Sequence, residues 1–130
     1  MMEILAVGPA ASFAEMSDEI GLAGGASIEL TASGAEAQEI LSERKVDLVV
    51  IDETLKDMTG LSLARQVAFR NPMTAVALVS PLSPEDFHEA TEGLGILVQL
   101  SPRPGRRESR SLLETLDRVM RMTRTAGATP

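Results

Sequence analysis

Four short apolar runs, separated by segments with helical periodicity, constrain the fold of this chain more than any other feature. The runs at residues 3–7, 46–51, 74–79 and 96–100 are too short for helices and contain β-branched residues. A fifth, weaker run alternates apolar and polar residues over 27–31. Apolar strands that alternate with helices form parallel sheets covered on both faces, so the sequence predicts an α/β domain with five parallel strands.

The helices are placed by their capping residues and apolar spacing. Ser33, with Glu36 three residues later, forms a capping-box pattern, Ser83 precedes a proline at the first helical position, and Thr59 or Gly60 starts a helix ending at Arg70. The remaining helices are expected at 11–22 and 106–123, and the Ser83 helix through residue 92. Right-handed crossovers then give a three-layer, doubly wound (βα)5 sandwich with strand order 2-1-3-4-5. The domain is expected to span residues 1–123, with 124–130 as a C-terminal tail or linker.

Composition and charge exclude several classes of function. The chain has no cysteine, so neither disulfides nor thiolate chemistry is expected. No apolar run approaches the ~20 residues that span a bilayer, and the amino-terminal residues do not resemble a signal peptide, so we expect a cytoplasmic protein without a membrane segment. Residues 1–102 hold five Lys or Arg and sixteen Asp or Glu, a balance of −11, whereas residues 103–130 carry +4. An acidic body with only three phenylalanines as aromatics argues against nucleic-acid binding.

Ligands of such sheets bind at the carboxyl ends of the strands, where the strand order reverses. Gly8 and Pro9 end the first strand, Asp52 the third and Ser80 the fourth, and Ser101 follows the fifth. The candidate site therefore consists of these five positions.

The stretch DLVVIDETLKDMTG resembles the receiver domain of bacterial two-component response regulators (CheY-like), over about residues 3–122. Asp52 stands at the family's phosphate-accepting aspartate, Ser80 at its hydroxyl position, and Ser101-Pro102 where the family has lysine and proline. Met58 and Gly60 also fall in register, while Lys56 replaces the usual proline.

The departures from the family bear on function. Gly8 and Pro9 occupy the positions of the acidic pair that helps hold Mg²⁺, Ser101 replaces the phosphate-contacting lysine, and Val98 replaces the strand-five aromatic. The resemblance therefore implies a degenerate receiver, or pseudo-receiver: a non-enzymatic protein-interaction module without cofactor. The alternative is a phosphorelay receiver that accepts a phosphoryl group at Asp52 from a histidine kinase, with Mg²⁺ required only in that case. A flavodoxin-like binding protein shares the sheet order, but the chain lacks aromatic residues to sandwich a flavin.

Asp52 also has a structural interpretation. A carboxylate at a strand end can accept hydrogen bonds from its own loop or from Ser80. The only metal ligands suggested near it are Asp52 itself and, by family analogy, the backbone carbonyl of Thr54, which makes a weak set. Glu53 is expected to point away, and Asp57 is expected to lie in the loop after the strand.

The partner surface is expected on the fourth and fifth helices, the face that commonly carries partner contacts in receivers. The last helix is expected to bury Leu112, Leu113, Leu116, Val119 and Met120 and so to expose arginines. The predicted partner-face residues are Phe87, His88, Arg110, Arg118 and Arg121. This face would bind a histidine kinase, an output protein or a second copy of the chain; alternatively, its charges pair within the domain.

Overall fold

The computed structural model describes the backbone of residues 1–128 and the side chains of residues 1–122. Five parallel strands form one sheet of order β2-β1-β3-β4-β5, as the sequence predicts. The strands are β1 (Met2–Val7), β2 (Ala26–Thr31), β3 (Leu48–Ile51), β4 (Ala75–Val79) and β5 (Val98–Leu100). The helices are η1 (Ala10–Phe13), α1 (Ala14–Ala23), α2 (Gly34–Glu43), α3 (Gly60–Arg70), α4 (Pro84–Ala90) and α5 (Arg106–Ala128).

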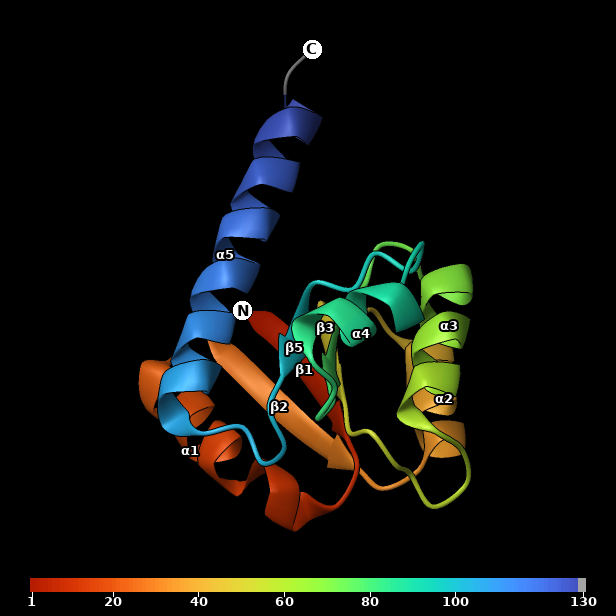
Figure 1. Ribbon diagram of the computed structural model, residues 1–130. Helices are drawn as coiled ribbons and strands as arrows, with labels where there is room; N and C mark the ends of the chain where they lie inside the picture. Colours follow the sequence, from red (N-terminus) through yellow and green to blue (C-terminus); the bar gives the residue numbers. More distant parts are fainter. Residues whose placement is uncertain (129–130) are drawn as a thin grey trace.

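The sheet separates two apolar clusters, because neighbouring strand residues point to opposite faces. In β3, Leu48 and Val50 face one cluster, whereas Val49 and Ile51 face the other. The first cluster includes side chains of α1 and α5, and the second includes side chains of α2, α3 and α4. Figure 1 shows the resulting three layers. The carboxyl ends of β1, β3 and β4 therefore meet at one edge of the sheet.

Three helix caps agree with the sequence. The hydroxyls of Ser33, Thr59 and Ser83 each accept a hydrogen bond from the backbone N–H three residues later. The capping box at Ser33 is only half formed, because Glu36 accepts the hydroxyl of Thr31 in place of the Ser33 N–H. A side-chain partner on the neighbouring strand has displaced the local one.

Several predicted boundaries were wrong. The first helix begins as a 3-10 turn at Ala10 and becomes α-helical at Ala14. Helix α4 ends at Ala90 instead of residue 92, ahead of Gly93 and Gly95, which both have positive φ. Helix α5 continues to Ala128, five residues beyond the predicted end at 123, so most of the expected tail is helical in its backbone, and residues 129–130 lie outside the described residues.

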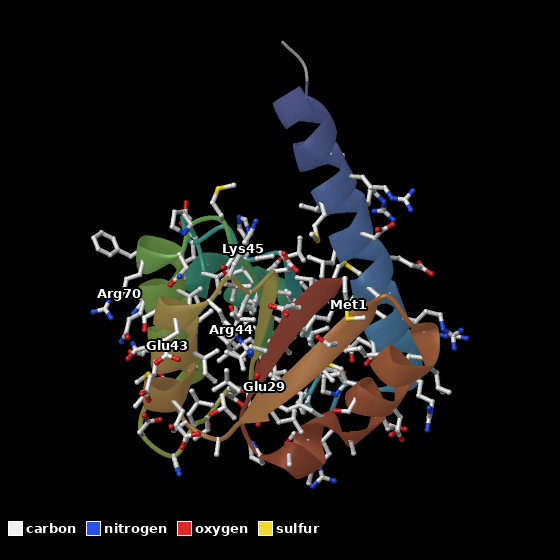
Figure 2. The ribbon with its side chains drawn as sticks, turned by 180° about the vertical axis from the view of Figure 1, so that it is seen from behind. Met1, Glu29, Glu43, Arg44, Lys45 and Arg70 are labelled. Carbon is white, nitrogen blue, oxygen red and sulfur yellow. The ribbon has the colours of Figure 1, made fainter. Side chains whose placement is uncertain are left out.

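An ion pair links the end of α2 to the outer strand β2. Arg44, which follows α2, donates a hydrogen bond to Glu29 of β2 (Figure 2).

Within the described part of the chain, no helix is long and apolar enough to cross a membrane.

Candidate functional site

Asp52 lies at the carboxyl edge of the sheet, where β1 and β3 pair. Its backbone N–H donates to the carbonyl of Val7 at 2.9 Å, which places it beside Gly8. The side chain is half-buried, and its Oδ1 accepts the N–H of Glu53 at 2.8 Å. Asp52 thus bonds its own loop, as its structural interpretation requires, and no hydrogen bond joins it to Ser80 among the described residues.

Gly8 packs directly against the Asp52 side chain. A Cβ at position 8 would lie 2.6 Å from the Asp52 Cβ, 3.3 Å from its Oδ2 and 3.2 Å from the ring of buried Phe13. Gly8 also has a φ of 144°, which disfavours any residue with a side chain. Position 8 therefore cannot carry a carboxylate without moving Asp52 or the turn after β1.

Gly60 closes the opposite side of the same residue. A Cβ there would lie 2.1 Å from the backbone oxygen of Asp52, and the Gly60 N–H donates to the Glu53 carbonyl at 2.8 Å. Asp52 is thereby held between two glycines, one at the end of β1 and one at the start of α3. Pro9 is exposed and immediately precedes η1, consistent with a helix-start role.

Ser80 and Ser101 are both occupied by local hydrogen bonds. The buried hydroxyl of Ser80 accepts the N–H of Leu82 at 3.2 Å, a turn after the strand end. Ser101 donates from its N–H and its hydroxyl to the two carboxylate oxygens of Glu108, at 2.8 and 2.6 Å. At the position of the family's lysine, the chain therefore holds a serine bound to a carboxylate of α5. Glu108 was not predicted at the site, and its only signal in the sequence is its place in the first turn of the last helix.

Asp57 links the loop after β3 to another helix. Its two carboxylate oxygens accept the N–H groups of Gly34 and Ala35 at 2.9 and 3.0 Å, at the start of α2. These two backbone hydrogen bonds lower the pKa of Asp57 from its ordinary value of 3.8. Asp57 is thus committed to α2 and does not supplement Asp52.

The loop between Asp52 and Gly60 is closed on itself. Thr54 and Thr59 form an antiparallel bridge, and the Leu55 N–H donates to the Met58 carbonyl at 3.0 Å. The sulfur of Met58 lies 2.5 Å from where a Cβ of Gly34 would be, so Gly34 is the glycine that lets this loop approach α2. Of the described residues, no group of three or more His, Cys, Asp or Glu side chains is placed to hold a metal ion.

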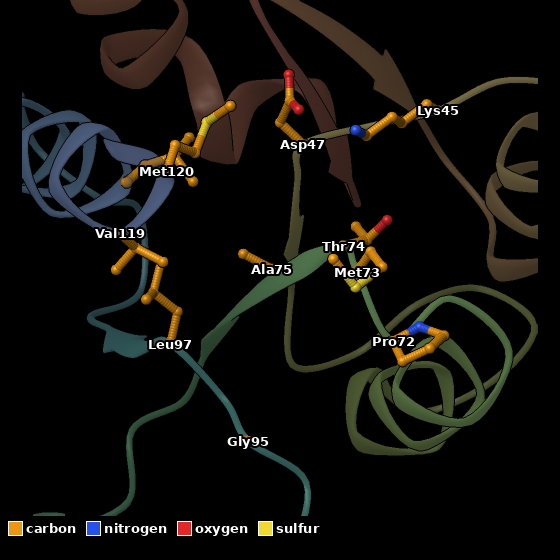
Figure 3. Close-up of a pocket in the computed structure, with 11 residues that line it drawn as sticks. Lys45, Asp47, Pro72, Met73, Thr74, Ala75, Gly95, Leu97, Val119 and Met120 are labelled. Carbon is orange, nitrogen blue, oxygen red and sulfur yellow. The ribbon is translucent and has the colours of Figure 1, made fainter. Parts of the chain in front are cut away.

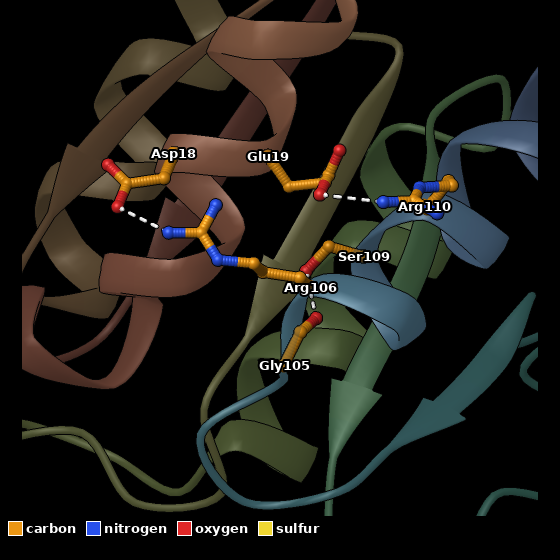
Figure 4. A network of polar contacts seen from close by, with 6 residues as sticks. All are labelled: Asp18, Glu19, Gly105, Arg106, Ser109 and Arg110. Atoms are coloured by element: carbon orange, nitrogen blue, oxygen red, sulfur yellow. Dashed lines mark hydrogen bonds and ion pairs between the residues drawn. The ribbon is translucent and has the colours of Figure 1, made fainter.

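The predicted partner face is only partly present. Phe87 is buried in the core with 9% of its surface exposed, because it points inward from α4, whereas His88 is exposed. Arg110 points to α1, where it pairs with buried Glu19 at 3.3 Å, next to a second pair between Arg106 and Asp18 (Figure 4). Phe87 was therefore assigned wrongly to that face. Arg110 is exposed as predicted, with 64% of its side chain accessible, and its pair with Glu19 matches the alternative that the charges pair within the domain.

The last helix also differs from prediction in its exposed residues. Arg121 pairs with Asp117 within the same helix at 3.0 Å, while Arg118 is exposed. Leu112, Leu113 and Leu116 are buried as predicted, but Val119 is 36% exposed and Met120 only partly buried. The helix begins to leave the body of the domain near Val119, although Met120 still packs against the core.

Comparison with known proteins identifies the family. The family model of the response regulator receiver domain matches residues 11–101. The chain belongs to this family. Among curated proteins, no sequence matches it.

Solved receiver structures share the fold at low sequence identity. The receiver domain protein of Methanospirillum hungatei JF-1 is 18% identical, with a TM-score of 0.80 over 94% of this chain and 98% of that one. Chemotaxis response regulator CheY4 of Vibrio cholerae is also 18% identical, with a TM-score of 0.78 over 89% of this chain and 98% of that one. The receiver domain of an HD domain-containing protein from Pseudomonas fluorescens Pf-5 is 20% identical, with a TM-score of 0.78 over 95% and 92%. These similarities establish the CheY-like architecture, and the chain is a receiver domain of two-component signalling.

Proposed function

We propose that this receiver domain is a pseudo-receiver, a protein-interaction module that works without phosphorylation at Asp52. One observation carries the proposal: Gly8 packs on Asp52 so closely that no side chain fits at position 8. An acidic pair at the end of β1 is therefore incompatible with the present position of Asp52.

The remaining donors suit the phosphoryl chemistry poorly. Mg²⁺ prefers near-octahedral oxygen ligands, commonly with one or two carboxylates from protein. Here Asp52 is the single carboxylate that β1 and β3 direct at the site, and Pro9 offers no side-chain oxygen. The residues present do not fit a receiver-type magnesium site, and we assign the domain no cofactor.

The charge next to Ser101 is negative, which is the wrong sign for phosphoryl transfer. Transfer to a carboxylate needs positive charge near the phosphoryl oxygens. Ser101 supplies none, and its hydrogen bonds bring the negative charge of Glu108 to the position of the missing lysine. Each lost electrostatic contact of this kind costs on the order of 3 kcal/mol of transition-state stabilisation.

On this proposal the domain acts by binding a protein, such as a histidine kinase or an output protein, in the cytoplasm of a bacterium. It is not an enzyme and binds neither nucleic acid nor membrane. Its acidic body supports the exclusion of nucleic acid.

The second candidate is a phosphorelay receiver that accepts a phosphoryl group at Asp52. It is favoured by the half-buried carboxylate of Asp52 at the strand end, whose Oδ2 bonds no described residue. In this case the Ser80 hydroxyl, which accepts the Leu82 N–H, would have to donate its own proton to the phosphoryl group.

Incubation with acetyl phosphate and Mg²⁺, followed by intact-mass spectrometry, distinguishes the two candidates. The pseudo-receiver gives no phosphoryl mass, and beryllofluoride with Mg²⁺ leaves the amide signals of Asp52 and Glu53 in place. Asp52→Asn is the matched control. A phosphoryl mass on the wild type that is absent from Asp52→Asn would establish the phosphorelay receiver instead.

A further inference from the structure

The outward side of α3 carries a large aromatic side chain between two cations. Phe69 is 87% exposed, because it stands on the side of the helix opposite buried Val67. Arg65 precedes it by one helical turn and Arg70 follows it, and both arginines are exposed. Met73, just past the end of the helix, is also largely exposed. A helix that packs well on its inner side thus presents apolar and basic groups together on its outer side.

A groove lies beside this side of α3, between it and α2. It encloses about 210 Å³, and buried Leu41 and Val67 are among its lining residues together with Arg70. Gln38 of α2 and Gln66 of α3 also line it, and their side-chain amides form no hydrogen bond with a described residue. The groove therefore offers two amide groups that can bond the backbone of an extended segment.

Positive charge gathers at this end of an otherwise acidic body. Residues 1–102 hold sixteen Asp or Glu and only five Lys or Arg. Four of these five basic residues stand on α3 or directly after α2 (Figure 2): Arg44, Lys45, Arg65 and Arg70. Arg44 is paired with Glu29 of β2, but the other three form no ion pair with any residue that the structure describes. Three cations are thus available to carboxylates from outside the domain.

Lys45 joins this surface where the two helices end. The Asn71 side chain donates a hydrogen bond to the carbonyl of Leu41 at 3.4 Å, which ties the end of α3 to α2. Lys45 and Met73 then line the same hollow of about 530 Å³ at the amino edge of the sheet (Figure 3). We call the group the α3 surface, and its residues are Lys45, Arg65, Phe69, Arg70 and Met73.

The charges of the α3 surface indicate which kind of partner fits it. A segment rich in carboxylates is repelled by most of the acidic body, so it can approach only where the body offers cations. Arginine pairs with carboxylates through two parallel hydrogen bonds, and an exposed aromatic ring supplies apolar contact area. A flat anionic membrane would also meet the acidic residues around the surface, such as exposed Glu39 and Glu43 of α2. The chemistry therefore favours a narrow acidic segment over a lipid surface.

We propose that the α3 surface and the groove beside it bind an acidic segment of a partner protein. Carboxylates of the segment pair with Arg65, Arg70 and Lys45, and an apolar side chain of the segment packs on Phe69. The inference rests on the proposed function, in which the domain acts by binding a protein, and it adds the place and the chemistry of that contact. The α3 surface contains neither Asp52 nor any residue of α5.

A synthetic peptide of Asp and Glu residues around a central phenylalanine tests the α3 surface. The control peptide has Asn and Gln in place of the acids. In a titration of the isotope-labelled full chain, the acidic peptide should shift the amide NMR signals of residues 65–73 and should bind more weakly as NaCl is added. The control peptide should leave those signals in place.

Two matched pairs of variants locate the contact. Arg70→Glu should raise the dissociation constant of the acidic peptide at least about tenfold, whereas Lys56→Glu should leave it unchanged. Lys56 is the control because it undergoes the same change of charge on an exposed side chain in the loop after β3. Phe69→Ala should raise the dissociation constant at least about fivefold, and Leu22→Ala, at an exposed apolar residue of α1, should not change it.

Circular dichroism checks that each variant is folded, and Arg65→Glu takes the place of Arg70→Glu if that variant is not. A wild type that fails to bind the acidic peptide up to about 1 mM, or binding indifferent to either Arg70→Glu or Phe69→Ala, would overturn the inference. Co-sedimentation of the wild type, but not of Arg70→Glu, with phosphatidylserine vesicles would assign the surface to a membrane instead. The phosphoryl mass at Asp52 is a separate measurement, so failure of the α3 surface and failure of the pseudo-receiver proposal are told apart.

Discussion

Gly8 is a residue whose missing side chain determines what its neighbour can do. The turn after β1 brings its Cα against Asp52 and Phe13, and its φ of 144° belongs to the region that favours glycine. The contact fixes Asp52 from the side on which a receiver usually carries acidic residues. The loss of stability caused by adding a single methyl group at this position therefore reports how tightly the site is packed.

We predict that Gly8→Ala lowers the free energy of unfolding by about 2–4 kcal/mol, from overpacking and backbone strain together. Urea denaturation measures the change. Gly21→Ala is the control, because Gly21 lies in α1 with no atom within 4 Å of the added Cβ, and it should stabilise the protein by about 0.5–1 kcal/mol. Equal effects of the two substitutions would show that position 8 is not constrained as described.

Helix α2 depends on a residue from a different element. Ser33 caps the Glu36 N–H locally, but the N–H groups of Gly34 and Ala35 are bonded by Asp57, more than twenty residues away. The loop after β3 and the start of α2 therefore form one unit, and a negative charge near the amino end of the helix also suits its dipole.

We predict that Asp57→Asn destabilises the domain and flattens its stability at acid pH. The pKa of Asp57 is lowered in the folded state, so its contribution is complete above the ordinary value of 3.8 and is lost as the pH falls through the folded-state pKa. Thermal unfolding measured from pH 7 down to about pH 2.5 should show a shallower decline for the variant. Glu53→Gln, an exposed change in the same loop, should keep the wild-type slope.

The sequence indicated the elements well because their signals are local. Apolar runs marked the strands, and Ser33, Thr59 and Ser83 marked helix starts. The contacts that shape the site are not local: Asp57 reaches α2, and Glu108 reaches Ser101 across the loop before α5. Neither carries a pattern in the chain, since hydrogen bonds between separate elements depend on a geometry that only the packed sheet supplies. For the same reason Phe87 was predicted to lie on the partner surface, although it is buried in the core.

On the scale of the whole molecule, the basic last helix is joined to the acidic body along one seam. Arg106 and Arg110 of α5 pair with Asp18 and Glu19 of α1, respectively. Part of the positive charge of the last helix is therefore balanced by acidic residues within the domain. Arg118 and the pair formed by Arg121 and Asp117 lie farther along the helix. The stability of the domain thus rests on apolar packing and on this seam.

We predict that Mg²⁺ has little effect on the stability of the molecule. A site with a dissociation constant near 10 mM would contribute only about 0.4 kcal/mol at about 10 mM Mg²⁺, which shifts the Tm by about 2 °C or less. Differential scanning calorimetry against NaCl of equal ionic strength measures the shift. A rise of more than about 5 °C that disappears in Asp52→Asn would reveal a magnesium site and contradict the pseudo-receiver.

The packing of Gly8 on Asp52 also limits how this domain could be re-engineered into a phosphate acceptor. Introducing an aspartate at position 8 alone would push Asp52 out of place, so the first step would damage the residue that it is meant to assist. Replacing Ser101 with lysine alone would leave Glu108 to neutralise the new cation. Neither substitution is therefore expected to create a phosphate acceptor by itself. The backbone of the turn after β1 would have to change first, and the side chains only after it.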